Sequence, residues 1–524
     1  MTVYIDSTAG GGGNGTIGTP YNSFTEVNAL TGDQGGETFA LKAGSVFREE
    51  LAIGFSGFAG AYNYTITSYG DGEVPVIKCS DDITATSWTA AGSDWYITET
   101  TGHTAVWVDG VLMRAVSLIG SMGDDTSFYD SGTNRLYIRP ASGDPNSATL
   151  VEQQANRSAA AGATDRDKCL RIYQATAQTA NTDVTVEKIN LVGGYDGLWV
   201  SNVRDNVVIQ DLRVIECVTR ESGNNPSGSG AGDGMILYAK GSAAEVASLY
   251  PKGLVVRRNY CYFNSHYGIE FWGFEGANID SNSVVNNGAG IEVWGYVKNS
   301  TIQRNIIKNC VDTDELYTDN NDGIFIATAA VGAYFGNSDN ITIKNNVVVG
   351  ADKPAVRVLC GTHTLSGNYL EGGRSGSSNP YALFADALPN STTTLRLNNN
   401  VFHTRVSSSY ITWAAGTPPS ATEKVVTSTT SDYNCYWDDD DAGNFTNVRH
   451  QPEDSAVTST TLADLKSNVV HDQNSVSVDP RQFFVDIDNG DFRLRGDAPF
   501  SVGPYGAAGG TGEQSIISNR IIKH

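Results

Sequence analysis

The chain has 524 residues and a formal net charge of −23, with 57 Gly and 40% hydrophobic residues. Nucleic acids and anionic membranes need basic partners, so this charge excludes general binding to either, but not binding of an anionic sugar polymer in a local basic pocket. No run of about 18 apolar residues predicts a membrane span. Abundant Gly and β-branched residues favour β-structure with tight turns and little helix.

Residues 1–50 are predicted to form an N-terminal cap and a first coil. The Gly-rich segment YIDSTAGGGGNGTIGTPYNSF leads into a short helix-like stretch near 25–30 and the phrase FALKAGSVFREELAI. An elongated repeat fold needs a cap of this kind to cover its first coil. No signal peptide precedes the first strand phrase, so we expect an extracellular or virion-associated protein whose leader was removed or which leaves the cell by lysis.

Residues 51–181 are predicted to hold early coils interrupted by a small β-subdomain at about 80–152. The phrases SWTAAGSDWYIT, TAVWVDGVLMRAV and NRLYIRPASGDP are typical of short alternating strands. Turn signals such as Asp109-Gly110 and Asp144-Pro145 separate these strands. The repeat period is lost here, which indicates an insertion into the early coils.

Residues 182–404 carry a recurring phrase that predicts regular coils. An I/V/L-x-x-N pattern ends at six asparagines whose consecutive spacings are 23, 23, 41, 22 and 32 residues. Spacing in this range is typical of a solenoid, in which each repeat stacks on its neighbours and equivalent positions form columns. The asparagines are Asn259, Asn282, Asn305, Asn346, Asn368 and Asn400.

Two repeats contain nearly the same strand phrase, GIEFWG with Glu270 and Trp272 and GIEVWG with Glu292 and Trp294. Side chains alternate along a strand, so the intervening apolar residues are expected in the core and the Glu and Trp on the outer face. Stacked strands lie about 4.8 Å apart, which would bring the carboxylates, and likewise the indoles, within one strand spacing. The sequence therefore predicts an acidic pair beside an aromatic pair on an exposed sheet.

Two neighbouring rungs extend this patch. Aligning the chain on the Gly before each strand places GDGMILY, with Asp233, on one side and NDGIFIA, with Asp322, on the other. Insertions flank both rungs, and insertions in a solenoid form loops on one face. We expect these loops to wall both ends of the patch and make a cleft. They are residues 220–232, 239–253, 312–320 and 328–340.

The four acids are candidate catalytic residues. Like charges one rung apart repel, so the pKa of at least one of Glu270 and Glu292 is expected to be raised. Glycoside hydrolysis needs one protonated and one ionised carboxyl group, and this pair supplies both states together with Asp233 and Asp322. The structural alternative is a solvated outer strand face. Carboxyl groups on adjacent rungs suit a retaining mechanism and those two rungs apart an inverting one, so the stereochemistry stays open.

Aromatic residues beside the acids are candidate substrate-binding residues. Trp272 and Trp294 offer flat apolar platforms for pyranose rings, with Tyr238 and Tyr267 at the margin. Ordinary packing is the alternative for the Trp pair.

Two further residues are interpreted in two ways each. Arg357 lies in the column of the two Glu on a later rung, where it binds an acidic sugar or pairs with Asp322. His266 directly precedes the Glu270 strand and is either a turn residue or part of the site.

Residues 405–524 are predicted to form terminal coils and a C-terminal cap. The acidic run at 438–441 lacks the spaced ligands of a calcium loop and is predicted to be a solvated turn. The seven Cys include no CxxC pair, so we expect them to be buried structural residues, with no metal and no cofactor.

The opening segment, the WYIT / VWVDG / YDSGTNRLYIRPASGDP insertion, the Asn-ended phrases and the closing NSVSVDP / GDFRL resemble the right-handed parallel β-helix carbohydrate-active enzymes. These include glycoside hydrolases of the fucosidase and xylanase type, polysaccharide lyases and phage tailspike depolymerases. The resemblance covers nearly the whole chain and implies an all-β, right-handed parallel β-helix. It also implies acids in a cleft on the sheet, at Asp233, Glu270, Glu292 and Asp322.

Three functions follow from these observations. The first is a glycoside hydrolase that depolymerises a bacterial or algal extracellular polysaccharide. The second is a polysaccharide lyase on a uronate polymer, with Arg357, His266 and Tyr267 recruited. The third is a non-catalytic phage receptor-binding or adhesin β-helix. The expected partner is an oligo- or polysaccharide, in some cases anionic. A homotrimer is expected if the chain is a tailspike, and a monomer otherwise.

Overall fold

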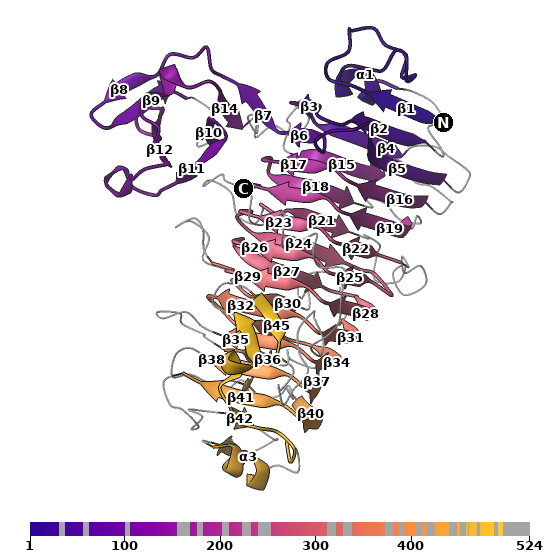
Figure 1. Cartoon of the computed structure of the whole chain (residues 1–524), viewed down its shortest axis with the longest axis vertical. Coiled ribbons are helices and arrows are strands. Elements are labelled where there is room, and N and C mark those ends of the chain that lie inside the picture. The colour runs from indigo at the N-terminus through magenta and orange to yellow at the C-terminus, as the bar shows by residue number, and fades with distance from the viewer. Residues whose placement is uncertain are drawn as a thin grey trace.

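The computed structural model shows an elongated all-β molecule built around a parallel β-helix, with a small domain projecting beside its N-terminal end (Figure 1). Three long sheets, here called sheets I, II and III, run along the axis of the β-helix. The fold class predicted from the sequence is confirmed. The described residues are 1–30, 37–55, 62–99, 105–154, 168–174, 182–201, 209–222, 232–238, 253–311, 321–327, 338–372, 381–386, 392–404, 411–414, 425–439, 448–450, 457–459, 461–468, 472–486 and 491–495.

Each regular coil gives one strand to each sheet, in the order I, III, II. Strand pairing is parallel throughout the coils, and only the last strand of sheet II pairs antiparallel. In the described residues, sheet I comprises β1 (Thr2–Ile5), β2 (Thr38–Lys42), β5 (Tyr62–Tyr69), β16 (Thr182–Glu187), β19 (Ile209–Ile215), β22 (Val255–Arg257), β25 (Asn278–Asp280), β28 (Lys298–Gln303), β31 (Asp339–Lys344), β34 (Gly361–Ser366), β37 (Thr392–Asn398) and β40 (Val425–Asp432). Sheet III comprises β3 (Val46–Phe47), β6 (Val76–Lys78), β17 (Asn190–Val192), β20 (Val218–Arg220), β23 (Tyr260–Tyr262), β26 (Ser283–Val285), β29 (Ile306–Lys308), β32 (Val347–Ala351), β35 (Tyr369–Gly372), β38 (Val401–Thr404) and β41 (Cys435–Asp438). Sheet II comprises β4 (Leu51–Phe55), β15 (Lys168–Gln174), β18 (Asp196–Ser201), β21 (Met235–Tyr238), β24 (Tyr267–Trp272), β27 (Ala289–Trp294), β30 (Ile324–Ala327), β33 (Val356–Val358), β36 (Leu383–Asp386), β39 (Ile411–Ala414), β42 (Val448–His450) and β43 (Val457–Ser459).

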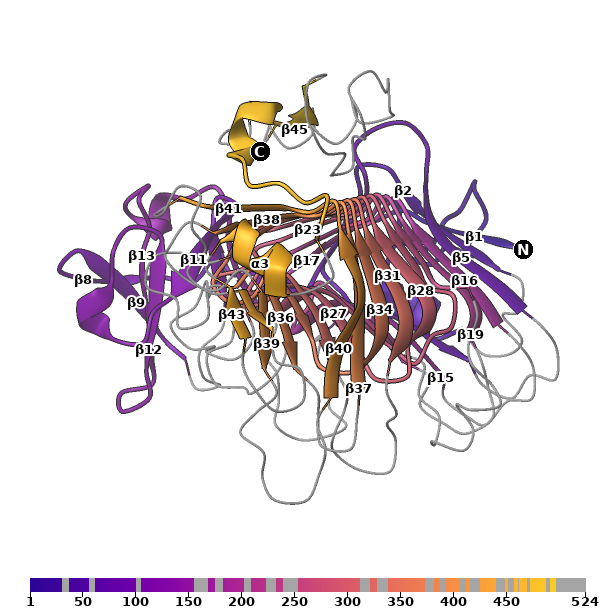
Figure 2. The ribbon, with the colours of Figure 1, turned by 90° about the horizontal axis from the view of Figure 1, so that it is seen from below.

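The hydrophobic core is a continuous column enclosed by the three sheets (Figure 2). Alternate residues of each strand point into it, including Ile269 and Phe271 of β24 and Ile291 and Val293 of β27, as predicted. All seven cysteines are buried and none forms a disulfide, so their predicted structural role as small core residues agrees with their environment.

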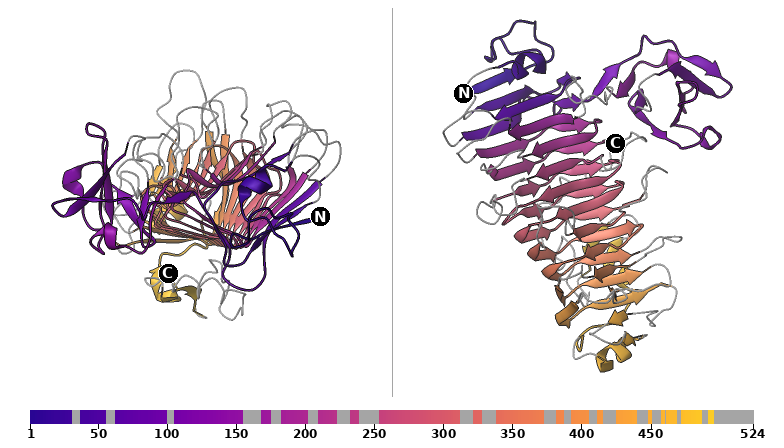
Figure 3. Two further views of the ribbon diagram at one scale, coloured as in Figure 1. Left: turned by 90° about the horizontal axis from the view of Figure 1, so that it is seen from above. Right: turned by 180° about the vertical axis from the view of Figure 1, so that it is seen from behind.

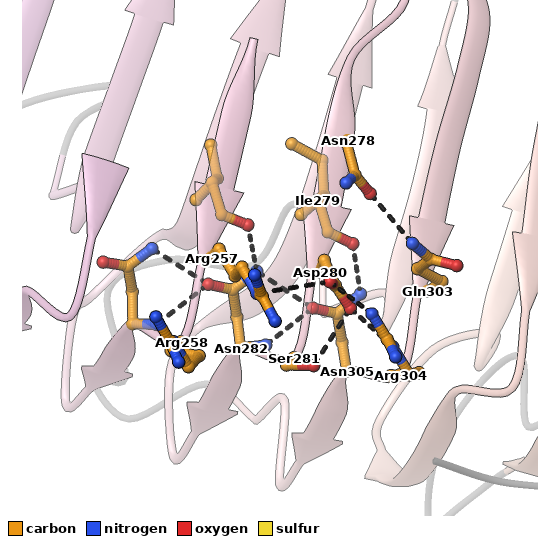
Figure 4. Close-up of polar contacts among 12 residues, drawn as sticks. Arg257, Arg258, Asn278, Ile279, Asp280, Ser281, Asn282, Gln303, Arg304 and Asn305 are labelled. Atoms are coloured by element: carbon orange, nitrogen blue, oxygen red, sulfur yellow. Dashed lines mark hydrogen bonds and ion pairs between the residues drawn. The ribbon is translucent and has the colours of Figure 1, made fainter. Parts of the chain in front are cut away.

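A ladder of buried asparagines lines the bend from sheet I to sheet III. Asn282 donates from both its backbone N–H and its side-chain amide to Oδ1 of Asn305, at 2.9 and 3.0 Å, and its amide also donates to the carbonyl of Val256 (Figure 4). The six asparagines predicted to form a column all belong to this ladder, which continues to Asn434. Buried polar groups are costly unless they are paired, and here the side-chain oxygen of each asparagine accepts hydrogen bonds from the asparagine of the preceding coil.

The residue before each ladder asparagine makes the turn. Arg258, Ser281 and Arg304 all have φ of 56°, the left-handed conformation, which costs a non-Gly residue about 1–2 kcal/mol. The asparagine side chain offsets this cost by bonding the backbone groups that the bend removes from the sheets. The I/V/L-x-x-N phrase therefore encodes a strand end, a left-handed residue and a ladder position.

Replacing Asn305 with Ala is expected to lower the free energy of unfolding by about 3 kcal/mol, because two donors of Asn282 and the carbonyl of Ile279 lose their buried partner. Urea unfolding monitored by far-ultraviolet circular dichroism measures this loss. Gln303→Ala is the matched control, since its amide bonds Asn278 on the outside of sheet I (Figure 4). A loss no larger in Asn305→Ala than in the control would contradict a stabilising ladder.

The projecting domain contains an eight-stranded sheet between Ser80 and Gln154, the region for which the sequence predicts an inserted β-subdomain (Figure 3). It has a separate core around Val106, Leu136 and Ile138. Its mostly antiparallel sheet contains β7 (Ser80–Asp82), β8 (Thr89–Ala91), β9 (Asp94–Thr98), β10 (Val106–Val108), β11 (Val111–Ala115), β12 (Thr126–Asp130), β13 (Arg135–Arg139) and β14 (Val151–Gln154), with the short helices η1 (Ile119–Ser121) and η2 (Pro145–Ser147).

Two buried acids attach this subdomain to the β-helix. The indole of Trp107 donates to Glu221 at 2.5 Å. Glu152, fully buried, accepts hydrogen bonds from Arg48 at 3.0 Å and from Lys78. Charged groups on both sides of the junction are thus paired, as burial requires.

The two ends of the β-helix are covered differently. At the N-terminus, the predicted helix is α1 (Phe24–Asn28), capped by the Ser23 side chain. At the C-terminal end lies α3 (Leu462–Asn468), whereas η3 (Pro480–Phe483), β44 (Phe484–Asp486) and β45 (Asp491–Leu494) belong to a segment that runs back along sheet III, where Phe484 packs near Val347 and Tyr369 (Figure 1). Val476, Val478 and Phe484 pack on the outer face of sheet III.

The described half of the acidic run, Asp438 and Asp439, is not a solvated turn, which corrects the prediction for these two residues. Asp438 is only 1% exposed because it ends the paired strand β41, and Asp439 pairs with His403 and with Arg481 of η3, at 3.1 and 3.0 Å. The tyrosine hydroxyl of Tyr369 contacts the other His403 nitrogen at 2.6 Å. Residues 440 and 441 lie outside the described residues. These contacts hold the C-terminal segment against sheet III.

Candidate active site

The outer face of sheet II gathers the predicted site residues. Strands β24 and β27 pair in register, with Glu270 opposite Glu292 and Trp272 opposite Trp294. The alignment of the repeated phrases in space is as the sequence predicts. Because Ile269 and Phe271 fill the core, Glu270 and Trp272 lie on the opposite, outer face.

Asp233 and Asp322 enter this face at the starts of the flanking strands β21 and β30. Each is followed by a glycine at which the chain closes on its neighbour: a Cβ on Gly234 would lie 2.5 Å from the Thr219 hydroxyl, and one on Gly323 would lie 2.2 Å from a methyl of Val348. No side chain fits at these glycines. The Asp-Gly pair therefore puts the carboxylate outside and the backbone against sheet III.

Asp196 is a fifth acid of this face that the sequence reasoning missed. It starts β18, one rung before β21, and is 2% exposed. The phrase YDGLWV around it repeats the Asp-Gly-apolar pattern of the Asp233 and Asp322 rungs, and this signal would have found it. The acidic cluster, as named here, comprises Asp196, Asp233, Glu270, Glu292 and Asp322.

The two glutamates are buried, whereas the sequence predicted an exposed pair. Glu270 is 5% exposed and Glu292 3%. A second apolar cluster outside the main core explains this burial, since Tyr267, Phe325 and the partly buried Trp294 pack together on the outer face. The solvated-face alternative for the glutamates is therefore wrong.

Glu270 and Glu292 differ in their hydrogen bonds. The indole N–H of Trp272 donates to Oε1 of Glu270, and the hydroxyl of Tyr238 lies 3.5 Å from the same oxygen. Oε1 of Glu292 has no hydrogen-bond partner among the described residues. One member of the pair is thus held as an acceptor, and the other presents a buried oxygen with unused hydrogen-bonding capacity.

Burial raises the pKa of both glutamates. The pKa of Glu270 lies well above its usual range, through burial and then through the charges of Asp233 and Glu292. Burial raises the pKa of Glu292 to about 8; the charge of His266 opposes the rise, and those of Asp233 and Asp322 add to it. The sequence prediction of a raised pKa agrees with this environment. At neutral pH the pair therefore retains a proton.

Each aspartate of the cluster lies beside a cation. Asp233 Oδ1 is 2.9 Å from Nδ1 of His266 and also accepts the backbone N–H of Tyr267. The other two pairs are longer and are Asp196 with Lys168 at 3.8 Å and Asp322 with Arg357 at 3.6 Å. Three of the five acids of the cluster thus have a basic side chain as a partner.

These pairs shift two further groups. Burial lowers the pKa of His266, but Asp233 and the other acids outweigh it and raise the pKa above its ordinary value. Burial raises the pKa of Asp322 to about 6, against the opposing charges of Arg357 and Lys353.

The aromatic residues take two positions. Trp272 and Trp294 stack with ring centroids 5.7 Å apart, and Tyr238 lies 4.4 Å from Trp272, all three partly exposed. Tyr267 is fully buried, whereas the sequence predicted it at the margin, because it packs in a cluster with Ala289 and Phe325. The exposed group forms a continuous aromatic surface beside Glu270.

Asp233, His266 and Glu270 are close enough to share a cation. One ligand atom from each residue lies within 4.8 Å of the others. Carboxylate oxygens suit hard divalent ions, and a single imidazole is compatible with them.

The predicted loop walls lie mostly outside the described residues, so the cleft remains a prediction. These are the insertions at 223–231, 239–252, 312–320 and 328–337. In the described part of the chain, no helix is long and apolar enough to cross a membrane.

Comparisons with known proteins concern the fold. No family model and no curated protein matches the chain. Among solved structures it is similar to a glycoside hydrolase, with 9% identity, 83% of this chain and 93% of that chain covered, and a TM-score of 0.48. It is also similar to the complex of XylC with xylose, with 12% identity, 83% of this chain and 84% of that chain covered, and a TM-score of 0.46. For a rhamnogalacturonan lyase the identity is 10%, the coverage is 80% of this chain and 84% of that chain, and the TM-score is 0.37. The structures similar to this chain are thus carbohydrate-active β-helices, as the sequence resemblance indicated. Activity has to be argued from the residues of the site.

Proposed function

We propose that the chain is a glycoside hydrolase that depolymerises a bacterial or algal extracellular polysaccharide, outside the cell or as part of a virion. The observation that carries the proposal is the buried, in-register pair Glu270 and Glu292 with raised pKa values. Acid-assisted cleavage of a glycosidic bond needs a carboxyl group that keeps its proton at neutral pH and a second that acts as a carboxylate.

The hydrogen bonds support a division of roles. Glu292 is the proton donor to the leaving oxygen, because its Oε1 has no partner in the described residues and its pKa is about 8. Glu270 is the carboxylate, because the donors of Trp272 and Tyr238 favour its ionised form and oppose the burial and the charges of Asp233 and Glu292 that raise its pKa. It acts as the nucleophile or as the base for a water molecule.

The aromatic surface supports a sugar ligand. Stacked Trp272 and Trp294 with Tyr238 present rings next to the acids, and pyranose faces pack on such rings. Asp233 and His266 lie within reach of Glu270 and position it electrostatically.

The proposal is tested by incubating the purified chain with a panel of bacterial and algal polysaccharides and measuring new reducing ends. A hydrolase releases reducing ends without a rise in near-ultraviolet absorbance. No new reducing ends on any polymer of a broad panel, with binding intact, would count against catalysis and favour a binding module.

A polysaccharide lyase is the second candidate, and the Asp233, His266 and Glu270 cluster favours it. A divalent cation held there would neutralise the carboxyl group of a uronate and ease removal of the neighbouring proton. Such a lyase would give unsaturated products that absorb in the near ultraviolet, and a chelator would stop it. The hydrolase is expected to be insensitive to chelation.

A further inference from the structure

Arg357 is stacked between two phenylalanines on the outer face of sheet II. It lies in register between Phe325 of β30 and Phe384 of β36, and its guanidinium carbon is 4.8 and 5.8 Å from their ring centroids. Stacking on aromatic faces fixes the plane of a guanidinium and leaves the N–H donors on its edge available. The side chain is therefore held in place by contacts that use none of its hydrogen bonds.

The donors of Arg357 are not used up by its neighbours. Oδ2 of Asp322 is 3.6 Å from Nη1 of Arg357, which is longer than a hydrogen bond. The Nε atom is buried and has no hydrogen-bond partner among the described residues, and the side chain as a whole is 29% exposed. Buried polar groups are normally paired, so a fixed guanidinium with unused donors beside solvent is arranged for a ligand.

Arg357 stands at a definite distance from the proposed catalytic pair. The column of paired residues runs Glu270, Glu292, Phe325, Arg357, so Arg357 is two strands beyond Glu292. Two strand spacings amount to about 10 Å along the sheet. This is the length of one or two sugar residues in an extended chain that lies along the β-helix axis.

The ion pair with Asp322 does not account for this arrangement by itself. Asp322 is fully buried, and neither of its oxygens has a hydrogen-bond partner in the described residues. A pair kept for stability would be expected to close to a bidentate contact, as Arg304 does with Asp280 at 2.6 and 2.8 Å on sheet I. Asp322 instead balances the charge of Arg357 while leaving its edge open.

We propose that Arg357 binds an anionic substituent, a carboxylate or a sulfate, on a sugar one or two residues from the bond that is cleaved, so that the substrate is an acidic polysaccharide. This inference rests on the proposed function for the position of the cleaved bond. Its recognition chemistry is the planar fork of N–H donors, which matches the paired oxygens of a carboxylate or sulfate.

The test measures binding to the full chain carrying Glu292→Gln, so that no probe is turned over. The probes are tetrasaccharides of glucuronate, galacturonate and mannuronate, the carboxyl-reduced neutral form of each, and sulfated galactose tetrasaccharides. Isothermal titration calorimetry is expected to show at least one anionic probe binding 10-fold or more tighter than a neutral one. Adding Arg357→Met is expected to abolish that preference and to leave neutral probes within about twofold. Arg357→Lys keeps the positive charge but lacks the planar fork of donors. Its preference for anionic probes is expected to lie between those of Arg357 and Arg357→Met.

Arg304→Met, in the same background, is the matched control, because it removes an Asp-paired arginine from the bend between sheets I and III, away from sheet II, and should change no affinity. Thermal unfolding checks that each variant is folded. Equal binding of anionic and neutral probes, a preference that survives Arg357→Met, or no binding of any anionic probe would overturn the inference. Uronate and sulfate probes separate the two sources of charge. If the protein prefers anionic probes but the unsubstituted chain cleaves no polymer, the hydrolase is rejected and this inference is kept. If the unsubstituted chain cleaves neutral polymers and the protein binds anionic and neutral probes equally, the hydrolase is kept and this inference is rejected.

Discussion

Glu292→Gln is expected to lower the rate of glycoside hydrolysis at neutral pH by about 10³-fold, because the amide cannot give a proton to the leaving oxygen. Glu270→Gln is expected to lose a similar factor, since it removes the carboxylate that Trp272 and Tyr238 orient. The Gln side chain matches protonated Glu in shape, so both variants should fold. Initial rates of reducing-end release, on whichever polysaccharide the unsubstituted chain cleaves, give the comparison.

The control for this experiment is Glu275→Gln. Glu275 follows β24 and bonds the amide of Asn299, away from the acidic cluster, and its variant should keep nearly full activity. Near-normal rates in both Glu270→Gln and Glu292→Gln would rule out the proposed mechanism. Loss in only one would show that a different acid, with Asp233 first in line, fills the other role.

Stability of the unsubstituted chain is expected to fall as the pH rises from about 4.5 to 8. The folded pKa of Glu292, about 8, lies above the value of 4.5 that applies when the chain is unfolded. Between these values the folded state holds more protons than the unfolded state, so the free energy of unfolding decreases with rising pH. A difference of 3.5 units corresponds to at most about 5 kcal/mol. The pKa of Glu270 is also raised, and that of Asp322 is raised to about 6, so both groups lower the stability in the same direction as the pH rises.

Glu292→Gln is expected to remove a large part of this fall and to be more stable than the unsubstituted chain at pH 8. Urea unfolding at a series of pH values from 4.5 to 8.5 measures both slopes. Glu275→Gln should keep the slope of the unsubstituted chain, because Glu275 lies outside the buried pair. A slope that Glu292→Gln does not change would mean that Glu292 titrates normally and lacks the proton required of the acid.

The position of the site residues in the fold could be predicted because a solenoid turns sequence period into spatial columns. The repeated GIE-aromatic-WG phrase placed Glu270 over Glu292, and the Asn phrase marked the bends, since each ladder Asn follows the left-handed residue at a bend. Arg357 was placed in the same column by the same period. Asp196 was missed although its Asp-Gly phrase has the same form.

The surroundings of these residues could not be predicted in the same way. Burial of Glu270 and Glu292 depends on Tyr267, Phe325 and Trp294 packing together on the outer face. The repeat pattern of a solenoid predicts which side chains point outward, but not how those side chains pack against one another. Similarly, the acidic run at the end of β41 is predicted to be solvated from its composition alone. The partners of Asp439 are His403 and Arg481, which are far from it in sequence.

The sequence by itself determined the all-β solenoid, the inserted subdomain, the alternation of faces and the stacking of the two glutamates, because each depends on local period and on neighbouring repeats alone. Only the tertiary structure decided how deeply the acids are buried and which basic residue lies beside each aspartate. It also decided that Arg357 is stacked between two aromatic rings, with hydrogen-bond donors that its described neighbours do not use. Burial and charge pairing are sums over side chains from several coils, and these sums set the pKa values on which the proposed chemistry depends.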